Sequence, residues 1–293
     1  MSATPGTIES AHVDFYRENG YLVTEELIPM ADVEMLRRET LAIYRGQGSV
    51  RGMTPVDPGE SEATTLSRYF CLHFPHKISK PILDFVRHPA LVEVLSAIIG
   101  PNVKCMQTMF FAKAPSGRGQ AWHQDEFFIP TRDRSLCGAW VALDDVDQEN
   151  GCLWVMPGSH EPGVLWPMDE NRDDRISGPS RSSYGYPFPD DDAVPVEMKA
   201  GSVVFFNGYL LHRSFDNLSA DRFRRALVIH TMSAESLLPA DFGRRIEPTD
   251  DMRDIVMVCG DDPYAYKGVE DLIEPFLRGE SPEQYREAAE SST

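Results

Sequence analysis

The sequence predicts a mainly β fold of the sandwich or jelly-roll type, with a helical N-terminal third. Two observations support this prediction. After about residue 102, short runs rich in Val, Phe, Trp, Leu and Ile are separated by turn sequences such as PSGRG, DQENG and DNLSAD. Strands that follow one another without a helix between each pair favour packed antiparallel sheets over a doubly wound parallel sheet. Before residue 100, apolar residues instead recur at helical spacing.

Three helices are expected in the first hundred residues. Residues 8–19 form the first, which ends at Gly20 because glycine readily adopts the left-handed conformation of a helix C-cap. The next covers residues 29–45, begins with a proline and has apolar residues at helical spacing. The third covers residues 89–99, and a glycine follows it. Residues 46–65, rich in Gly, Pro, Ser and Thr, are expected to form a loop.

Apolar runs predict the strands of the remaining chain: VKCMQTMFFAKAP, CGAWVALDDV, GCLWVMPGSH, VEMKAGSVVFFNGYLLHRSF and RRALVIHTM. Residues 165–195, which lie between the third and the fourth run, are polar and contain several prolines. A loop of this length inside a compact domain is usually functional, so we interpret it as a lid. From about residue 233 onward, the sequence indicates a mixture of helix and loop.

The charge balance limits the classes of partner. The 293 residues include 28 Lys and Arg against 46 Asp and Glu, a formal charge of −18, and such a field repels nucleic acids and anionic membranes. No run of about 18 apolar residues and no signal-peptide core is present. Five widely spaced cysteines without a CxxC pair are typical of reduced thiols. We therefore expect a cytoplasmic protein whose partner is a small molecule, with its oligomeric state left open.

The strongest local motif is the sequence His123-Gln124-Asp125. In a strand, residues i and i+2 project from the same face, so His123 and Asp125 would point together. An imidazole beside a carboxylate provides two of the three ligands of a 2-His-1-carboxylate Fe(II) site. Alternatively, the pair forms a hydrogen bond that ties down a loop.

A second histidine strengthens the metal interpretation. The apolar run before His212 predicts a strand that brings this imidazole from another part of the barrel. Two histidines and one aspartate occupy one face of an octahedral metal and leave three positions for a chelating cosubstrate and dioxygen. If the cosubstrate is a dicarboxylic keto acid, an arginine would bind its distal carboxylate through two hydrogen bonds.

The strand after His212 begins with two arginines. Alternation places Arg224 on one face with His230, and Arg225 on the other. Small residues follow Arg224 on its face and suit the wall of a cavity, so Arg224 is the preferred cosubstrate ligand and Arg225 the alternative. Two adjacent arginines at a solvated strand end would produce the same pattern without any role in binding. His230 could line the cavity together with Arg224.

Four segments have the order and approximate spacing of a known family. They are FYRENGYLVTEELIPMADVEMLRRE near the start, MQTMFFAKAP before the HQD motif, AWVALDDVDQENGCLWVMPGSH after it, and GSVVFFNGYLLHRS around His212. Over about residues 12–232, the sequence resembles the phytanoyl-CoA dioxygenase (PhyH) family of Fe(II)/2-oxoglutarate-dependent oxygenases. The resemblance implies a double-stranded β-helix, a jelly roll of the cupin type. Because the sequence shows no internal repeat and no domain linker, we expect a single oxygenase domain over residues 1–293, with a core at about 12–232 and a C-terminal extension at 233–293.

Carried over residue by residue, the resemblance implies His123, Asp125 and His212 as the ligands of Fe(II). It also implies that Arg224 binds 2-oxoglutarate. The turn between His212 and the two arginines is about one residue longer than in the family, which leaves Arg225 open as the alternative.

The resemblance further implies cosubstrate contacts from Met109, Trp140 and Ser214. Gln107, on the same predicted strand as Met109, is a weaker candidate. Each of the first three has a purely structural alternative: Met109 and Trp140 as ordinary core residues, and Ser214 as a cap of the turn after the second histidine.

The reaction is implied in the same way. Asp125 occupies the position at which related halogenases have a small residue, so hydroxylation is favoured over halogenation. The expected enzyme uses Fe(II), 2-oxoglutarate and O2 to hydroxylate an unactivated C–H bond of a small organic metabolite, and releases succinate and CO2.

An acyl-CoA 2-hydroxylase is the alternative with the same mechanism. A non-redox metalloenzyme of the cupin type and a non-catalytic binding protein are further alternatives. The absence of an obvious glutamate base beside the ligands counts against the former.

Overall fold

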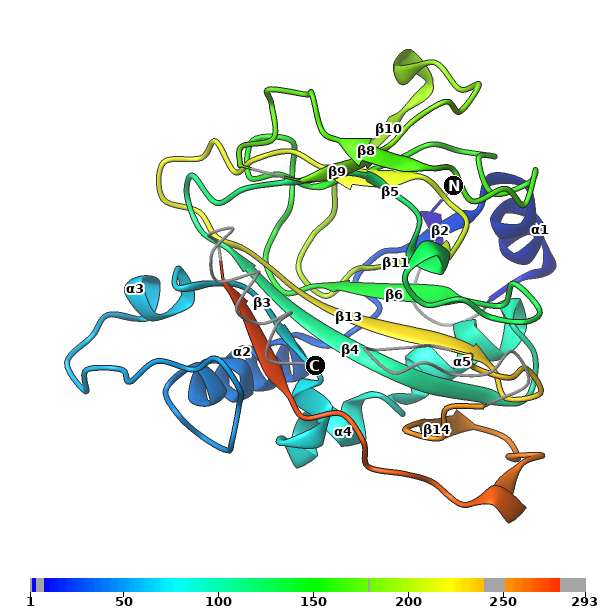
Figure 1. The fold of residues 1–293 in the computed structure, drawn as a ribbon, viewed down its shortest axis with the longest axis horizontal. Helices are drawn as coiled ribbons and strands as arrows, with labels where there is room; N and C mark the ends of the chain where they lie inside the picture. Colours follow the sequence, from blue (N-terminus) through cyan, green and yellow to red (C-terminus); the bar gives the residue numbers. More distant parts are fainter. Residues whose placement is uncertain (1, 4–7, 179, 240–250, 280–293) are drawn as a thin grey trace.

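Two mostly antiparallel sheets face each other, and helices cover the outer face of the larger sheet (Figure 1). The computed structural model describes residues 2–3, 8–178, 180–239 and 251–279. This arrangement is the jelly-roll fold that the resemblance implied. No helix within these described ranges has the length and apolar character needed to cross a membrane.

The helices lie within the first hundred residues, as predicted. In the described ranges the α-helices are α1 (Ser10–Asn19), α2 (Met30–Tyr44), α3 (Glu62–Leu66), α4 (Lys80–Phe85) and α5 (Pro89–Ile98). The C-cap of α1 is Gly20, whose φ of 79° is left-handed. The predicted loop at 46–65 extends too far, because Ser61 caps α3 by accepting a hydrogen bond from the Thr64 N–H.

The larger sheet has the strand order β1-β2-β11-β6-β13-β4-β3-β15, and β14 also pairs with β4. Its strands are β1 (Ser2–Ala3), β2 (Tyr21–Thr24), β3 (Tyr69–His73), β4 (Val103–Lys113), β6 (Cys137–Ala142), β11 (Val203–Asn207), β13 (Arg224–Ser233), β14 (Val256–Cys259) and β15 (Phe276–Gly279). The central strands β6, β13 and β4 are those that apolar runs predicted. β2 and β3 lie in the N-terminal third, which is therefore less purely helical than expected.

The smaller sheet has the strand order β10-β7-β12-β5. Its strands are β5 (Gln120–His123), β7 (Leu153–Val155), β10 (Val194–Val196) and β12 (His212–Ser214). A separate hairpin pairs β8 (Met168–Glu170) with β9 (Arg181–Ser183). Short 3-10 helices interrupt the connections: η1 (Pro75–Lys77), η2 (Asp125–Phe127), η3 (Asp190–Asp192) and η4 (Ala265–Lys267).

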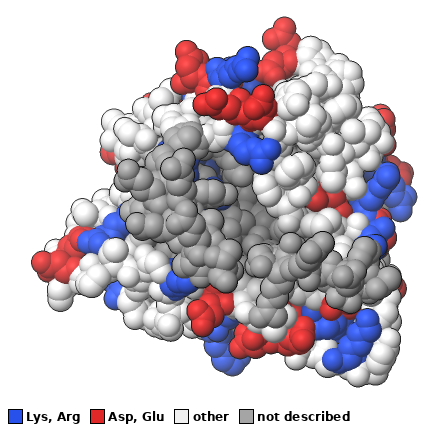
Figure 2. Space-filling model, viewed as in Figure 1, with Lys and Arg blue, Asp and Glu red and all other residues white. Residues whose placement is uncertain are grey.

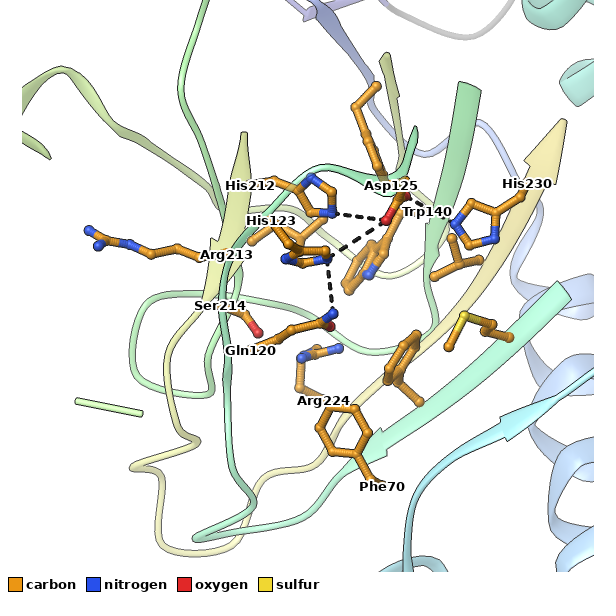
Figure 3. Close-up of a pocket in the computed structure, with 15 residues that line it drawn as sticks. Phe70, Gln120, His123, Asp125, Trp140, His212, Arg213, Ser214, Arg224 and His230 are labelled. Atoms are coloured by element: carbon orange, nitrogen blue, oxygen red, sulfur yellow. Dashed lines mark hydrogen bonds and ion pairs between the residues drawn. The ribbon is translucent and has the colours of Figure 1, made fainter. Parts of the chain in front are cut away.

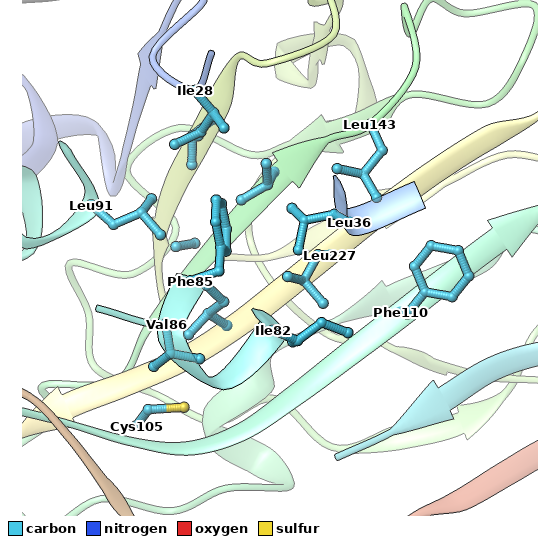
Figure 4. Packing of buried hydrophobic residues seen from close by; sticks show 14 of the residues in the cluster. Ile28, Leu36, Ile82, Phe85, Val86, Leu91, Cys105, Phe110, Leu143 and Leu227 are labelled. Carbon is cyan, nitrogen blue, oxygen red and sulfur yellow. The ribbon is translucent and has the colours of Figure 1, made fainter. Parts of the chain in front are cut away.

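Side-chain alternation in β13 divides the apolar core into two layers. Leu227 and Ile229 belong to the cluster under the helices, with Leu36 of α2 and Phe85 of α4 (Figure 4). Val228 belongs to a second cluster, between the two sheets. Burial of apolar side chains on both faces of one sheet joins the helices and the two sheets into a layered structure. The inner face of the larger sheet faces the smaller sheet, and its side chains form the second cluster and line the pocket between the sheets.

Residues 165–195 pack against strands of the smaller sheet, and the lid interpretation of this segment stays a prediction. Arg213 of β12 anchors them through a side chain that points away from the three candidate ligands (Figure 3): its Nη1 lies 2.8 Å from Asp190 Oδ2, and its guanidinium lies 4.4 Å from the centre of the Trp122 ring. The Trp122 Nε1–H also donates a hydrogen bond to Asp190. The described residues of this segment do not line the pocket between the sheets.

The C-terminal extension contains strands where a mixture of helix and loop was expected. β14 extends the ladder beside β4, and β15 pairs with β3. Ion pairs fasten the connecting segment, since Lys77 Nζ lies 2.6 Å from Asp254 Oδ2 and 2.7 Å from Asp271 Oδ1. Residues 240–250 and 280–293 lie outside the described residues, so the prediction for those segments is not tested.

The anchor at Asp190 predicts how the 165–195 segment responds to mutation. Asp190→Ala removes the carboxylate that binds Arg213 and Trp122, so proteolytic cleavage within the segment should become about threefold faster or more. Asp191→Ala is the matched control, because Asp191 is exposed and neighbours the anchor without sharing these contacts. Limited proteolysis with mass spectrometry measures both rates. Cleavage of the wild type that slows when ligands fill the pocket would instead support a lid.

Candidate active site

A pocket opens between the two sheets, with walls from β4, β5, β6, β12 and β13 (Figure 3). Of the residues that the sequence predicted to bind the metal or the cosubstrate, seven line this pocket: Met109, His123, Asp125, Trp140, His212, Ser214 and Arg224. His230, which we expected could line the cavity, lines it as well. Gln107 is not among the lining residues. Its Nε2 lies 3.5 Å from His73 Nδ1, and the side chain is buried beside the pocket.

The two predicted histidine ligands are direct partners in the smaller sheet. His123 ends β5, His212 begins β12, and the two residues pair in the antiparallel ladder, which brings their ring centres to 4.0 Å. Asp125 adds its carboxylate from η2. One ligand atom of each of the three residues lies within 4.8 Å of the others. Chain segments that are far apart in sequence therefore converge on one point.

Backbone carbonyls orient both imidazoles. His123 Nδ1 lies 2.8 Å from the Ala121 carbonyl oxygen, and His212 Nδ1 lies 3.0 Å from that of Leu210. A carbonyl only accepts, so Nδ1 carries the hydrogen in each ring and Nε2 keeps the lone pair that a metal needs. Burial and the nearby His212 lower the pKa of His123 to about 3, which keeps its ring neutral at physiological pH.

Asp125 remains a carboxylate in this buried position. Burial by itself would raise its pKa, but the imidazoles of His212 and His230 outweigh that effect and hold the pKa well below its usual range. Two neutral nitrogens and one carboxylate oxygen form the donor set of a 2-His-1-carboxylate site, which suits Fe(II) with open positions. The residues present thus fit the metal that the sequence implied.

The premise that Asp125 continues the strand of His123 is wrong. β5 ends at His123, and the chain turns into η2, where the Asp125 carbonyl accepts hydrogen bonds from the N–H groups of Phe128 and Ile129. The neighbouring Glu126 is buried, and burial raises its pKa to about 7. Its Oε1 accepts hydrogen bonds from the N–H and the hydroxyl of Thr131, so Glu126 stabilises this turn and does not line the pocket.

The two arginines of β13 point to opposite sides of the larger sheet, as the alternation predicts. Arg224 lines the pocket, and its guanidinium lies 5.5 Å from the centre of the Trp140 ring. Burial lowers its pKa to about 10, so it remains a cation at neutral pH. Arg225 instead forms ion pairs on the helical side, at 2.8 Å from Asp144 and 3.1 Å from Glu62.

A lysine that the sequence reasoning missed lies beside the Arg224 end of the pocket. Lys113 is the ladder partner of Arg224 and is buried. Its Nζ donates a hydrogen bond of 3.0 Å to Ser214 Oγ and one of 2.6 Å to the Phe215 carbonyl. An ammonium group only donates, so the Ser214 oxygen accepts here and its hydroxyl hydrogen is available to an anion in the pocket.

Gln120 is a further pocket residue that sequence reasoning missed. It lies three residues before His123, and regular alternation would turn it to the other face. The pairing of β5 with β12 shifts register between His212 and Ser214, which brings Gln120 to the pocket side. Its Nε2 lies 2.9 Å from His123 Nε2 (Figure 3). This contact uses the nitrogen that a metal needs, so Gln120 must turn aside when a metal binds.

This jelly roll, with two histidines and one aspartate at an open pocket and a buried arginine at its far end, defines the class of Fe(II)/2-oxoglutarate-dependent oxygenases. Residues 16–226 match the family model described as phytanoyl-CoA dioxygenase (PhyH). The chain belongs to that family. Its cofactor is Fe(II), and 2-oxoglutarate and O2 are its cosubstrates.

Curated relatives agree with this assignment. The chain is 31% identical over 232 residues to the peroxisomal phytanoyl-CoA dioxygenase of Homo sapiens. The aligned region covers 75% of this chain and 67% of the relative. It is 33% identical over 167 residues to a phytanoyl-CoA dioxygenase of Arabidopsis thaliana, with 56% of each chain covered.

Solved structures share the fold. The non-heme alpha ketoglutarate-dependent carbocyclase SnoK from nogalamycin biosynthesis matches with a TM-score of 0.60 and 22% identity, covering 94% of this chain and 99% of that one. EvdO2 from Micromonospora carbonacea, complexed with 2-oxoglutarate, matches with a TM-score of 0.59 and 24% identity, covering 83% of this chain and 96% of that one. At this level of identity, the likeness concerns the fold alone.

Buried histidines outside the triad make the stability of the protein sensitive to acid. His76 Nδ1 and Thr108 Oγ1 share a hydrogen bond of 2.7 Å. Burial lowers the pKa of His76 to about 4. The unfolded chain binds a proton at this histidine below about pH 6.5, whereas the folded chain binds one there only below about pH 4. Lowering the pH from 7 to 5 should therefore cost about 2 kcal/mol of unfolding free energy through His76 alone.

Urea unfolding of the metal-free protein at the two pH values measures this loss. His76→Asn removes the titrating group, so the loss between pH 7 and 5 should shrink by about 2 kcal/mol in this variant, whatever its stability at pH 7. An unchanged loss would show that His76 does not take part in the acid response.

Proposed function

We propose that the protein is a hydroxylase that oxidises an unactivated C–H bond of a small organic molecule and releases succinate and CO2. The position of Asp125 carries this proposal, because its Oδ1 lies 3.7 Å from His123 Nε2 and 3.6 Å from His212 Nε2. A protein carboxylate thus completes the triad and leaves no position on this face for a halide ion. Hydroxylation is favoured over halogenation for that reason.

In the proposed mechanism, His123, Asp125 and His212 hold Fe(II) on one face and leave the opposite face to small molecules. When bound, Fe(II) supplies the oxidative chemistry, driven by O2 and the decarboxylation of 2-oxoglutarate. The protein contributes fixed geometry and a pocket with aromatic walls, including Phe111 and Phe206, that exclude water from the reacting centre.

Arg224 and Ser214 bind the distal carboxylate of 2-oxoglutarate in this proposal. Among the described residues, the side-chain hydrogen bond of Arg224 runs from Nε to the Gly151 carbonyl at 3.2 Å, and its terminal nitrogens remain for a bidentate contact. The Ser214 hydroxyl donates to the same carboxylate while Lys113 donates to the Ser214 oxygen. Two buried cations at one end of the pocket favour a dicarboxylate over a neutral keto compound.

Surface charge supports a free small molecule over a CoA thioester as the substrate. On the face shown in Figure 2, Lys and Arg side chains are interspersed with Asp and Glu, and the described residues form no continuous basic area there. The chain carries a formal charge of −18 in total. A CoA thioester brings several phosphate charges that such a surface would repel.

Cosubstrate binding tests the proposal. Anaerobic addition of Fe(II) and 2-oxoglutarate should produce a weak visible charge-transfer band, and admission of oxygen should then yield succinate. Arg224→Gln should raise the Kd of 2-oxoglutarate, read from this band, by about 10- to 100-fold because a bidentate ionic contact is lost. His123→Ala should abolish both the band and the succinate.

Arg225→Gln is the matched control. Arg225 pairs with Asp144 on the helical side of the sheet, so this variant should keep the Kd of 2-oxoglutarate within about twofold while losing stability. A variant at Arg225 that alone weakened cosubstrate binding, or a band that survived in His123→Ala, would contradict the proposed roles.

A further inference from the structure

The two carboxylate oxygens of Asp125 have different partners. Oδ1 faces the Nε2 atoms of His123 and His212, at 3.7 and 3.6 Å. Oδ2 lies 3.1 Å from Nε2 of His230, on the side away from those two histidines (Figure 3). One oxygen is therefore directed to the metal position, and a third histidine holds the other oxygen.

His230 comes from the inner face of β13 and has little freedom to move. In the ladder it lies between Gly138 of β6 and Gln107 of β4, and only 4% of the residue is exposed. A carboxylate only accepts, so Nε2 of His230 carries the hydrogen of this contact. The same nitrogen cannot also be a metal ligand. Consistent with this, the group of potential ligands consists of His123, Asp125 and His212 without His230.

We infer that His230 is a positioning residue that keeps Asp125 a monodentate ligand and so preserves the position that 2-oxoglutarate needs. The inference rests on the proposed function. An octahedral metal with three protein ligand atoms has three positions left, two for a chelating cosubstrate and one for O2. A carboxylate that binds through both oxygens takes a fourth position. The hydrogen bond from His230 withholds Oδ2 from the metal and prevents that loss.

The affinity for the metal and the affinity for 2-oxoglutarate should respond differently when His230 is replaced, whereas loss of a merely structural residue would lower both. Without the hydrogen bond, Asp125 gains a second metal contact, so the metal itself should bind at least as tightly as before. 2-Oxoglutarate must then displace a carboxylate oxygen, so its affinity should fall. A residue that only supports packing would lower both affinities when it is replaced, because the three ligands would lose their common geometry.

Cobalt(II) is a suitable probe, since it is stable in air and its visible absorption reports coordination number. In His230→Leu, the Kd of Co(II) should stay within about twofold of the wild type or fall, and the Kd of 2-oxoglutarate for the Co(II) protein should rise about tenfold or more. His230→Gln places an amide N–H near the same point and should restore 2-oxoglutarate binding to within about threefold.

His76→Leu is the matched control, because His76 is buried and bonds to Thr108 without touching the triad. It should lower stability and leave both affinities unchanged. Unaltered 2-oxoglutarate binding in His230→Leu, or a joint loss of Co(II) and 2-oxoglutarate affinity, would overturn the inference. A wild-type Co(II) protein that does not bind 2-oxoglutarate would instead overturn the proposed function, so the two failures are distinguishable.

Discussion

The pairing of β5 with β12 is the constraint on which the whole site depends. Because His123 and His212 are partners in one antiparallel ladder, backbone hydrogen bonds of the sheet determine the spacing of the two imidazoles. Carbonyls of the same two chain segments then set the ring orientation through Nδ1. The metal geometry therefore follows from main-chain structure, which is rigid, and requires little from flexible side chains.

The larger sheet contributes the buried arginine, lysine and third histidine at or beside the pocket. Helices cover its outer face over an apolar cluster, and this burial stabilises a sheet whose inner face carries the buried Arg224 and His230 beside a second apolar cluster. Buried charges are costly without partners, and each one here has a partner: Gly151 for Arg224, Ser214 for Lys113, and His230 for Asp125. The pocket is thus organised for a metal and an anion before either binds.

Much of the site could be predicted from sequence because the chemistry needs particular residue types. An HQD motif, a distant histidine after an apolar run and an arginine on the next strand were sufficient to propose the triad and to favour Arg224 over Arg225 as the cosubstrate ligand. Gln120 and Lys113 were missed for different reasons. A register shift in a strand pair overrides the alternation that would exclude Gln120, and the role of Lys113 depends on a contact with another strand.

The sequence by itself predicted α1, α2 and α5, the central strands and the residue types that we propose to hold iron and a dicarboxylate, because those depend on local periodicity and on intrinsic chemistry. Only the tertiary structure decided where residues 165–195 lie, that β14 and β15 extend the larger sheet, and that His230 reaches the free oxygen of Asp125. These outcomes depend on contacts between distant segments, and the pattern of residues within one segment does not encode them.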